Sequence, residues 1–274
     1  MAITNKTTNK LNALDVSIQL GLSGLSFCIL QDGSTVTVLK QISFGKTLTP
    51  FEALDYLKNV FNTEPALNNS FSNITVIHDN DLSTLVPKPL FQEDYMADYL
   101  KFNTKILASD FLAHDHVISN DSVNVYVPYV NINNFIYDTF GAFTFKHVST
   151  ILIETILQIE KNSKTPKVYV NVSDKHFEIV VVNNGKLLLY NTFAYVTKED
   201  FIYYILFTTE QLGLNPERFE LIFIGNIDSK DELYTITYKY VQFVFFGKRT
   251  DTFKYKLDAQ PKTDYSNFAI LNSF

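Results

Sequence analysis

The feature of the sequence that most limits its fold is a pattern of short strands that occurs twice, 152 residues apart. The tight-turn dipeptides Asp32-Gly33 and Asn184-Gly185 mark the same point of each copy. Around each turn, apolar residues alternate with other residues over three short segments, which predicts an antiparallel three-stranded meander. At this offset, all six apolar positions of the first two strands fall on apolar positions of the second copy: 16, 18, 20, 25, 27 and 29.

A capped helix follows each meander. Thr49, Pro50 and Glu52 supply an N-cap, a proline at the first helical position and a capping box. Thr197 and Asp200 repeat this signal after the second meander. Two unrelated meanders would show the same alternation, but the repeated cap and the repeated order of elements favour a tandem duplication.

Apolar periodicity predicts the remaining elements. Helices are expected at 49–62, 87–102, 131–139, 149–161 with Ser149 as its cap, 197–212 and 229–238. Further strands are expected at 74–78, 123–127, 142–147, 219–224 and 241–246. Residues 103–122 show no clear pattern.

The pattern divides the chain into three parts. Residues 1–13 are expected to form a flexible tail, 14–147 a first lobe, and 148–274 a second lobe with a C-terminal segment. That segment is polar over 247–262 and apolar again at its end, so its last residues are expected to dock on the second lobe. Binding of this apolar end to a partner is the alternative.

Composition excludes several classes of protein. No apolar run approaches the roughly 20 residues of a membrane-spanning helix, and the polar N-terminus does not read as a secretion signal. The single cysteine, Cys28, excludes an intrachain disulfide and a cysteine-based zinc site, which favours the cytoplasm. The net charge is −6, and Arg218 and Arg249 are the only arginines, so nucleic-acid binding is disfavoured.

The repeated order of strands and helices resembles the actin-like ATPase (ribonuclease H-like) superfamily over about residues 14–246. In detail, the segments 14–20, 24–28 and 246–249 resemble a bacterial family of unknown function on that fold, domain of unknown function 3822. Actin-like pilus-assembly and cell-division proteins are more distant relatives. The resemblance implies an α/β fold of two duplicated ribonuclease H-like lobes around a cleft, each a mixed sheet with a three-stranded antiparallel meander and flanking helices.

The resemblance also implies a nucleotide cleft with two phosphate turns and an adenosine motif. The first turn would contain Gln19, Gly21, Ser23 and Gly24, with Gln19 where actin-like ATPases have aspartate. The second would contain Asn171, Ser173, Asp174 and Lys175, with both motif glycines absent and Asn171 in place of the acid. Gly225 and Asn226 would be the adenosine motif, which keeps one of its two glycines.

These substitutions remove much of the chemistry that the motifs supply. A Cβ prevents close approach of backbone to phosphate, and aspartates orient metal-bound water. We therefore assign no catalytic residue and no metal ligand, and expect no cofactor, with Mg-ATP as the alternative. Asp79 and Asp81 end a strand that, by resemblance, points into the cleft, so they are possible cleft acids, although a turn rich in Asp and Asn is the preferred interpretation.

The segment His114-Asp115-His116 is a compact group of possible metal ligands. An extended backbone would place both histidines on one face, where a metal ion could join them. A solvated loop is the favoured interpretation.

The sequence therefore leads to a hypothesis and two alternatives. The hypothesis is a cytoplasmic, non-catalytic protein of actin-like fold that serves as a partner-binding scaffold or as a degenerate nucleotide sensor. The first alternative is an ATP-binding actin-like ATPase with divergent phosphate loops, and the second is a purely structural protein. A protein partner is expected, whereas the sequence predicts neither its identity nor an oligomeric state.

Overall fold

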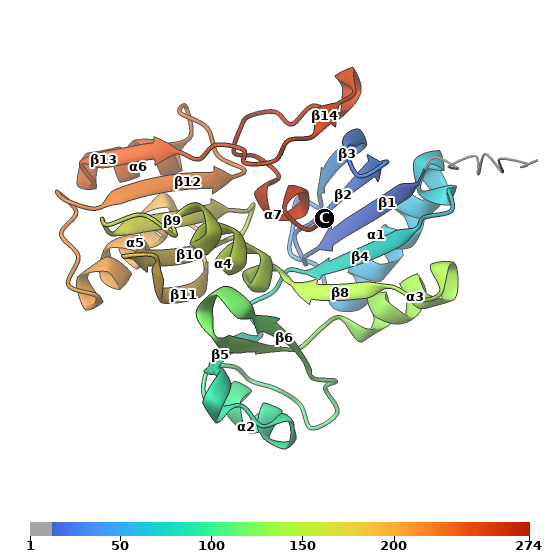
Figure 1. Cartoon of the computed structure of the whole chain (residues 1–274), viewed down its shortest axis with the longest axis horizontal. Helices are drawn as coiled ribbons and strands as arrows, with labels where there is room; N and C mark the ends of the chain where they lie inside the picture. The colour runs from blue at the N-terminus through green and yellow to red at the C-terminus, as the bar shows by residue number, and fades with distance from the viewer. Residues whose placement is uncertain (1–12) are drawn as a thin grey trace, which may run out of the picture.

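The structure, a computed structural model, describes residues 13–274, so the expected tail over 1–13 lies outside the described residues except for Ala13. Two large sheets lie next to each other, and a three-stranded sheet lies below them in the view of Figure 1. The first sheet has the strand order β14-β3-β2-β1-β4-β8, and the second has the order β11-β10-β9-β12-β13. No helix in the described range is long and apolar enough to cross a membrane.

The two predicted meanders lie in separate sheets, which confirms the duplication. The first sheet contains β1 (Leu14–Leu20), β2 (Gly24–Gln31), β3 (Thr35–Ser43), β4 (Asn73–His78), β8 (Thr144–His147) and β14 (Lys254–Tyr255). The second contains β9 (Lys167–Val172), β10 (His176–Asn183), β11 (Lys186–Ala194), β12 (Glu220–Gly225) and β13 (Phe243–Phe246). In each sheet, the first strand of the meander also pairs in parallel with the strand that follows the capped helix, β1 with β4 and β9 with β12.

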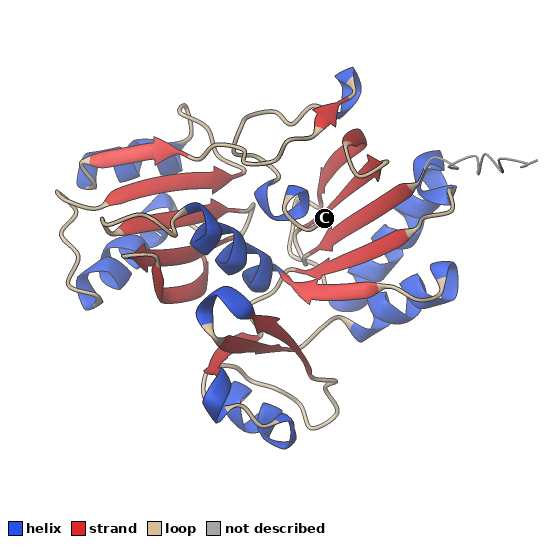
Figure 2. Ribbon diagram, viewed as in Figure 1, coloured by secondary structure: helices blue, strands red, loops and turns tan. Residues whose placement is uncertain are grey.

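Both predicted capping boxes are present. The first begins α1 (Pro50–Thr63) and the second begins α5 (Lys198–Gln211), and in each the threonine side chain accepts the backbone N–H of the acidic residue three positions later. Helix α3 (Val130–Phe140) packs with α1, and α6 (Glu232–Tyr240) packs with α5. Figure 2 shows these helix pairs against the outer faces of the two sheets.

Strand alternation gives each sheet two buried faces. Successive side chains of a strand point to opposite faces of its sheet. Val16 and Phe27 therefore belong to the outer core of the first sheet, and Val170 and Phe177 belong to the outer core of the second. The inner faces share a third core with α4 (Val148–Ile159) and α7 (Phe268–Leu271). Each of these helices packs on the sheet of the other copy: α4 follows β8 of the first sheet and contacts β10 and β11, and α7, at the end of the second half of the chain, contacts β1 and β2.

The C-terminal segment docks on both lobes and not on the second alone: Tyr265 stacks on Phe246 of the second sheet, whereas the rest of the segment reaches the first sheet. Strand β14 pairs in parallel with β3, at the edge of the first sheet. The side chains of α7 are buried in the shared core, and the Ser273 hydroxyl donates to Ser17 Oγ in β1. The apolar end of the chain is therefore part of the folded core between the sheets.

The helix predicted at 87–102 is also wrong. Residues 83–87 form β5 (Ser83–Pro87), and within the predicted span only α2 (Met96–Leu100) is α-helical, preceded by two short 3-10 helices, Lys88–Leu90 and Glu93–Tyr95. Pro89 disfavours helical geometry at the residue before it, and β5 gains its hydrogen bonds from β7 (Ser122–Tyr126), which is distant in sequence. With β6 (Ala113–Val117), in the segment without a clear pattern, these strands form the sheet β5-β7-β6. We call residues 82–127 the inserted subdomain.

Helix α4 is capped by His147 and not by Ser149. The His147 Nδ1 atom accepts the Ser149 backbone N–H at 3.2 Å, while its Nε2 atom lies 3.1 Å from the Asn80 carbonyl oxygen. A neutral ring with its proton on Nε2 satisfies both contacts. Burial lowers the pKa of His147 to about 4, although Asp79 and the Asn80 carbonyl act in the opposite direction.

This cap predicts an acid-sensitive fold. Between pH 7 and pH 5 the unfolded chain binds a proton at residue 147, whereas the folded chain does not, so stability falls as the pH falls. The wild type is expected to lose about 2 kcal/mol more of its free energy of unfolding over this range than the variant His147→Asn, in which asparagine can keep the cap. Urea unfolding at each pH measures the difference, and exposed His116→Asn should follow the wild type.

The position of α7 predicts a large loss of stability on truncation of its side chains. Ile270 is completely buried, so Ile270→Ala should lower the free energy of unfolding by about 2–5 kcal/mol. Leu257→Ala, in the same segment but 85% exposed, should change it by less than about 0.5 kcal/mol. Equal denaturation midpoints for the two variants would show that α7 is not part of the core.

Candidate functional site

The structure brings the predicted cleft residues together between the two sheets. The β1–β2 turn and the β9–β10 turn, with the loops after β4 and β12, line three neighbouring cavities of about 50, 40 and 180 Å³. The cavity of about 50 Å³ is lined by Gln19, Gly21, Ser23, Gly24, Asp79, Ser173 and Asp174, among others. Asn171, Gly225 and Asn226 line the cavity of about 40 Å³, and Lys175 and Asp81 line the cavity of about 180 Å³.

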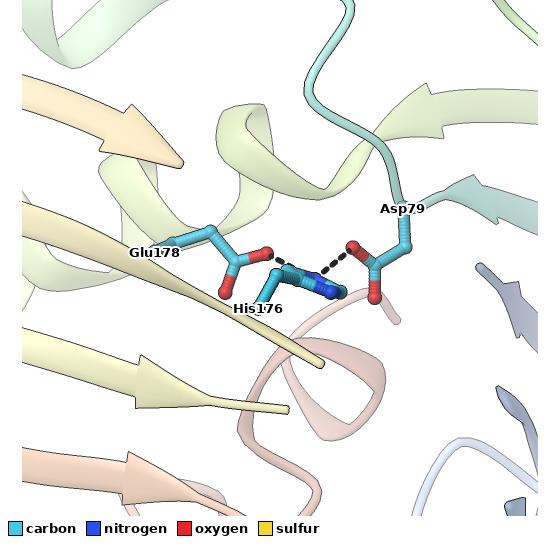
Figure 3. A group of neighbouring side chains, drawn as sticks. All are labelled: Asp79, His176 and Glu178. Atoms are coloured by element: carbon cyan, nitrogen blue, oxygen red, sulfur yellow. Dashed lines mark hydrogen bonds and ion pairs between the residues drawn. The ribbon is translucent and has the colours of Figure 1, made fainter. Parts of the chain in front are cut away.

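A histidine between two carboxylates crosses the cleft. The His176 Nε2 atom lies 3.0 Å from Asp79 Oδ1 and 3.1 Å from Glu178 Oε1 (Figure 3). Asp79 follows β4 of the first sheet, while His176 and Glu178 belong to β10 of the second. The glutamate is completely buried and Asp79 is 7% exposed. These three side chains therefore join the two sheets through buried polar contacts.

Two amide side chains hold the outer oxygens of this cluster. Gln19 Nε2 donates to Asp79 Oδ2 at 3.0 Å, and Asn171 Nδ2 donates to Glu178 Oε2 at 2.9 Å. Gln19 and Asn171 occupy equivalent positions of the two copies, 152 residues apart, and stand where the resemblance places the motif acids. At both positions an amide side chain thus stands where the motif has an acid. Each amide donates a hydrogen bond to a carboxylate of another element.

The close packing of these groups shifts their pKa values. Burial opposes a charge on His176, but the carboxylates of Asp79 and Glu178 outweigh it and raise the pKa of the imidazole above its usual value. Burial would raise the pKa of Asp79, but His176 and Gln19 hold it at about 2. For Glu178, burial is the largest effect, and with nearby Asp79 it raises the pKa of the carboxyl despite His176.

One backbone N–H group of each turn is hydrogen-bonded within that turn. The Gly21 N–H donates to the Gly24 carbonyl at 3.0 Å, and the Ser173 N–H donates to the His176 carbonyl at 2.9 Å. Asn226 Nδ2 donates to Asp174 Oδ1 across the second turn. Phosphate turns bind anions through free backbone N–H groups, and these two are engaged in closing their own turns.

The retained glycine of the adenosine motif has a structural reason. Gly225 has φ +87°, and a Cβ there would lie 2.5 Å from the Val172 carbonyl oxygen and 2.7 Å from Asn171 Oδ1. Its N–H donates to the Tyr265 carbonyl of the C-terminal segment. The packing of β12 against β9 therefore requires glycine at this position without any nucleotide.

Sequence reasoning missed two members of the cluster, His176 and Glu178. A signal for Glu178 was present, because it lies inside the apolar run Phe177–Val182 of a strand buried on both faces. A carboxylate in such a strand needs a polar partner. Glu178 is paired with His176, and His176 is paired in turn with Asp79. Asp79 is 97 residues away from His176 in the sequence, so only the tertiary structure identifies this contact.

The segment His114-Asp115-His116 lies in strand β6, not in a loop. The two histidine rings are neighbours, with centroids 5.5 Å apart, while Asp115 accepts hydrogen bonds from the Tyr126 hydroxyl, the Thr150 hydroxyl and the His147 N–H. Burial raises the pKa of Asp115, although these hydrogen bonds lower it. Asp115 therefore connects the inserted subdomain to the start of α4.

Comparison with known proteins identifies the family and the fold. A family model described as "Protein of unknown function (DUF3822)" matches residues 3–244. The chain belongs to this family. No curated protein matches it in sequence.

Solved structures agree with this assignment. A protein from Bacteroides thetaiotaomicron VPI-5482, described as having an actin-like ATPase fold and unknown function, is 25% identical with a TM-score of 0.73, over 86% of this chain and 91% of that one. The PilM-PilN type IV pilus biogenesis complex contains a chain with a TM-score of 0.59 at 10% identity, over 96% of this chain and 97% of that one. This member of the family therefore has the actin-like ATPase fold that the sequence predicted.

Proposed function

We propose that this chain is a non-catalytic scaffold of the actin-like fold that binds a protein partner. The observation that carries the proposal is the cluster of Asp79, His176 and Glu178, which crosses the cleft and is held at its outer oxygens by Gln19 and Asn171. The side chains nearest to both predicted phosphate turns thus bind one another. The single cysteine, Cys28, is fully buried and free, which supports a place in the cytoplasm.

The small size of the cavities in the cleft supports the proposal that no nucleotide binds there. Ligand sites for small molecules are usually about 300–1,000 Å³, whereas the three cavities around the turns measure about 40, 50 and 180 Å³. Their charge is also unfavourable for phosphate. Asp79, Asp81 and Asp174 line these cavities together with Lys175 and His176, and His176 is already paired with carboxylates.

A larger groove lies elsewhere, between the inserted subdomain and the second sheet. It measures about 810 Å³ and is lined by Ser83, Thr84 and Leu85 of β5 and by Tyr190, Asn191 and Thr192 of β11, among others. Both strands stand at an edge of their sheets in the described part of the chain. An edge strand offers unpaired backbone groups that an extended peptide can bind.

A buried acceptor points to the same groove. Asn124, which lines it, is 1% exposed, and its Nδ2 atom donates to the hydroxyls of Ser149 and Thr150. Its Oδ1 atom has no hydrogen-bond partner among the described residues. Such an orphaned acceptor is unfavourable unless a water molecule or a ligand donates to it.

Large apolar side chains are exposed on the inserted subdomain. Between residues 90 and 118 six of them are more than half exposed: Leu90, Tyr95, Phe102, Leu107, Phe111 and Ile118. Phe102 is 81% exposed and lines the groove. Exposed apolar side chains that gather in a patch are characteristic of a protein interface. The related PilM structure was solved together with PilN, so a chain of this fold can assemble with a protein.

Mg-ATP should neither stabilise the chain nor be hydrolysed by it. A ligand at 100 times its dissociation constant adds about 2.7 kcal/mol to stability, so a rise in melting temperature would reveal even moderate binding. We expect no rise at about 1 mM Mg-ATP and phosphate release at the background rate. Binding without turnover would support the nucleotide sensor. Mg-dependent hydrolysis that is lost in Ser23→Ala or Lys175→Ala would support the ATPase.

Substitution of Phe102 should weaken partner binding without unfolding the chain. Introduction of a charge in Phe102→Asp removes an exposed apolar contact at the groove, so the melting temperature should change little. Val196→Asp is the matched control, because Val196 is 93% exposed but does not line the groove. A protein that co-purifies with the wild type should be retained by Val196→Asp and lost from Phe102→Asp. Equal retention by both variants would exclude this surface.

A further inference from the structure

We propose that Asp79, His176 and Glu178 bind one divalent transition-metal ion, of the class of Zn²⁺ or Mn²⁺, which joins the two sheets across the cleft. This inference does not depend on the proposed scaffold function, because it concerns a bare ion and neither a nucleotide nor a partner.

The three side chains already hold their possible ligand atoms close together. One oxygen of each carboxylate and one imidazole nitrogen lie within 4.8 Å of one another. Figure 3 shows both carboxylates turned toward the imidazole from opposite sides. The ligands come from both sheets, so the ion would link β10 to the end of β4.

Hydrogen bonds alone neither give both carboxylates of this cluster a donor from His176 nor cancel the charge of the two ionised carboxylates. His176 Nε2 carries at most one proton, yet two carboxylate oxygens lie within 3.1 Å of it. Even with a charged imidazole, two ionised carboxylates leave a net negative charge in a buried place, which is unfavourable. A neutral imidazole, two carboxylates and a divalent ion would together be electrically neutral.

The surroundings have the organisation of a metal site. Metal-ligating carboxylates are usually held by further hydrogen bonds, and the amides of Gln19 and Asn171 hold the outer oxygens of both acids. The cavity of about 180 Å³ is lined by Asp79 and His176, so it offers a path for the ion and space for a water ligand. Three protein ligands and one open position are typical of zinc sites that keep a water molecule.

The ligand types restrict the metal. An imidazole nitrogen suits zinc, iron, copper and nickel, and carboxylates also suit manganese. Mg²⁺ and Ca²⁺ prefer six or more oxygen ligands, which these residues do not supply. Weak binding of Mg²⁺ is therefore part of the proposal.

Isothermal titration of the full chain, freed of metal with a chelator, tests the site. We expect one Zn²⁺ or Mn²⁺ ion per chain and a rise in melting temperature with the same stoichiometry, while Mg²⁺ produces neither. A wild-type chain that binds neither Zn²⁺ nor Mn²⁺ at about 100 μM would overturn the proposal.

Matched variants place the ion. Asp79→Asn and Glu178→Gln keep the side-chain shape but remove a charged ligand, so each should weaken binding by more than about 100-fold. Asp81→Asn removes a neighbouring acid of the same cavity and should bind as the wild type does. Circular dichroism shows whether the variants fold. If Asp79→Asn and Glu178→Gln do not fold, the comparison of the wild type with Asp81→Asn still tests the position of the ion. Loss of binding in Asp81→Asn would place the ion elsewhere. Unchanged affinity in the folded Asp79→Asn and Glu178→Gln variants would also overturn the proposal.

Discussion

The structure depends on the burial of both faces of each large sheet. Helices α1 and α3 cover the outer face of the first sheet and α5 and α6 that of the second, while the inner faces share one core with α4 and α7. Because α4 follows the first sheet and packs on the second, and α7 belongs to the second half of the chain but packs on the first sheet, neither inner face is covered by its own copy alone. The two halves are thus joined by apolar contacts that do not involve the cleft residues.

This shared core explains how a polar cluster can persist in the cleft. The apolar contacts fix the distance between β4 and β10, so that Asp79 and His176 meet with little loss of side-chain freedom. The same rigidity leaves only small cavities around the two turns. In the proposed scaffold the cleft stays closed, because separation of the sheets would break both the shared core and the buried ion pairs. The orphaned Asn124 oxygen and the exposed Phe102 lie instead at the groove of the inserted subdomain, where a ligand needs no such opening.

Local signals made the duplicated part of the fold predictable. The turns at Gly33 and Gly185 both have positive φ, and the capping boxes of Thr49 and Thr197 form as their spacing requires. The inserted subdomain was not predictable in the same way, because β5 is stabilised by pairing with β7, which is distant in sequence. Strand β14 has two residues and shows no alternation that could reveal it.

The candidate site was predicted only in part for a similar reason. The resemblance located Gln19, Asn171 and Asp79 by their place at or next to the ends of strands, and the structure shows what they contact. His176 and Glu178 could not be assigned partners from the sequence, since the contact with Asp79 depends on how the two sheets face each other. A buried glutamate within an apolar strand was the available signal. Without the position of the first sheet, it indicated only that some polar partner must exist.

The crossing of α7 also determines the order in which the protein can fold during synthesis. The strands β1 to β3 leave the ribosome early, but the helix that covers their inner face lies at residues 268–271, and the strand that pairs with β3 lies at 254–255. Until those residues emerge, the first sheet has an uncovered apolar face and an open edge, both of which favour aggregation. A nascent chain of this kind therefore needs a chaperone, or rapid translation of its second half, more than a protein whose first domain closes on itself.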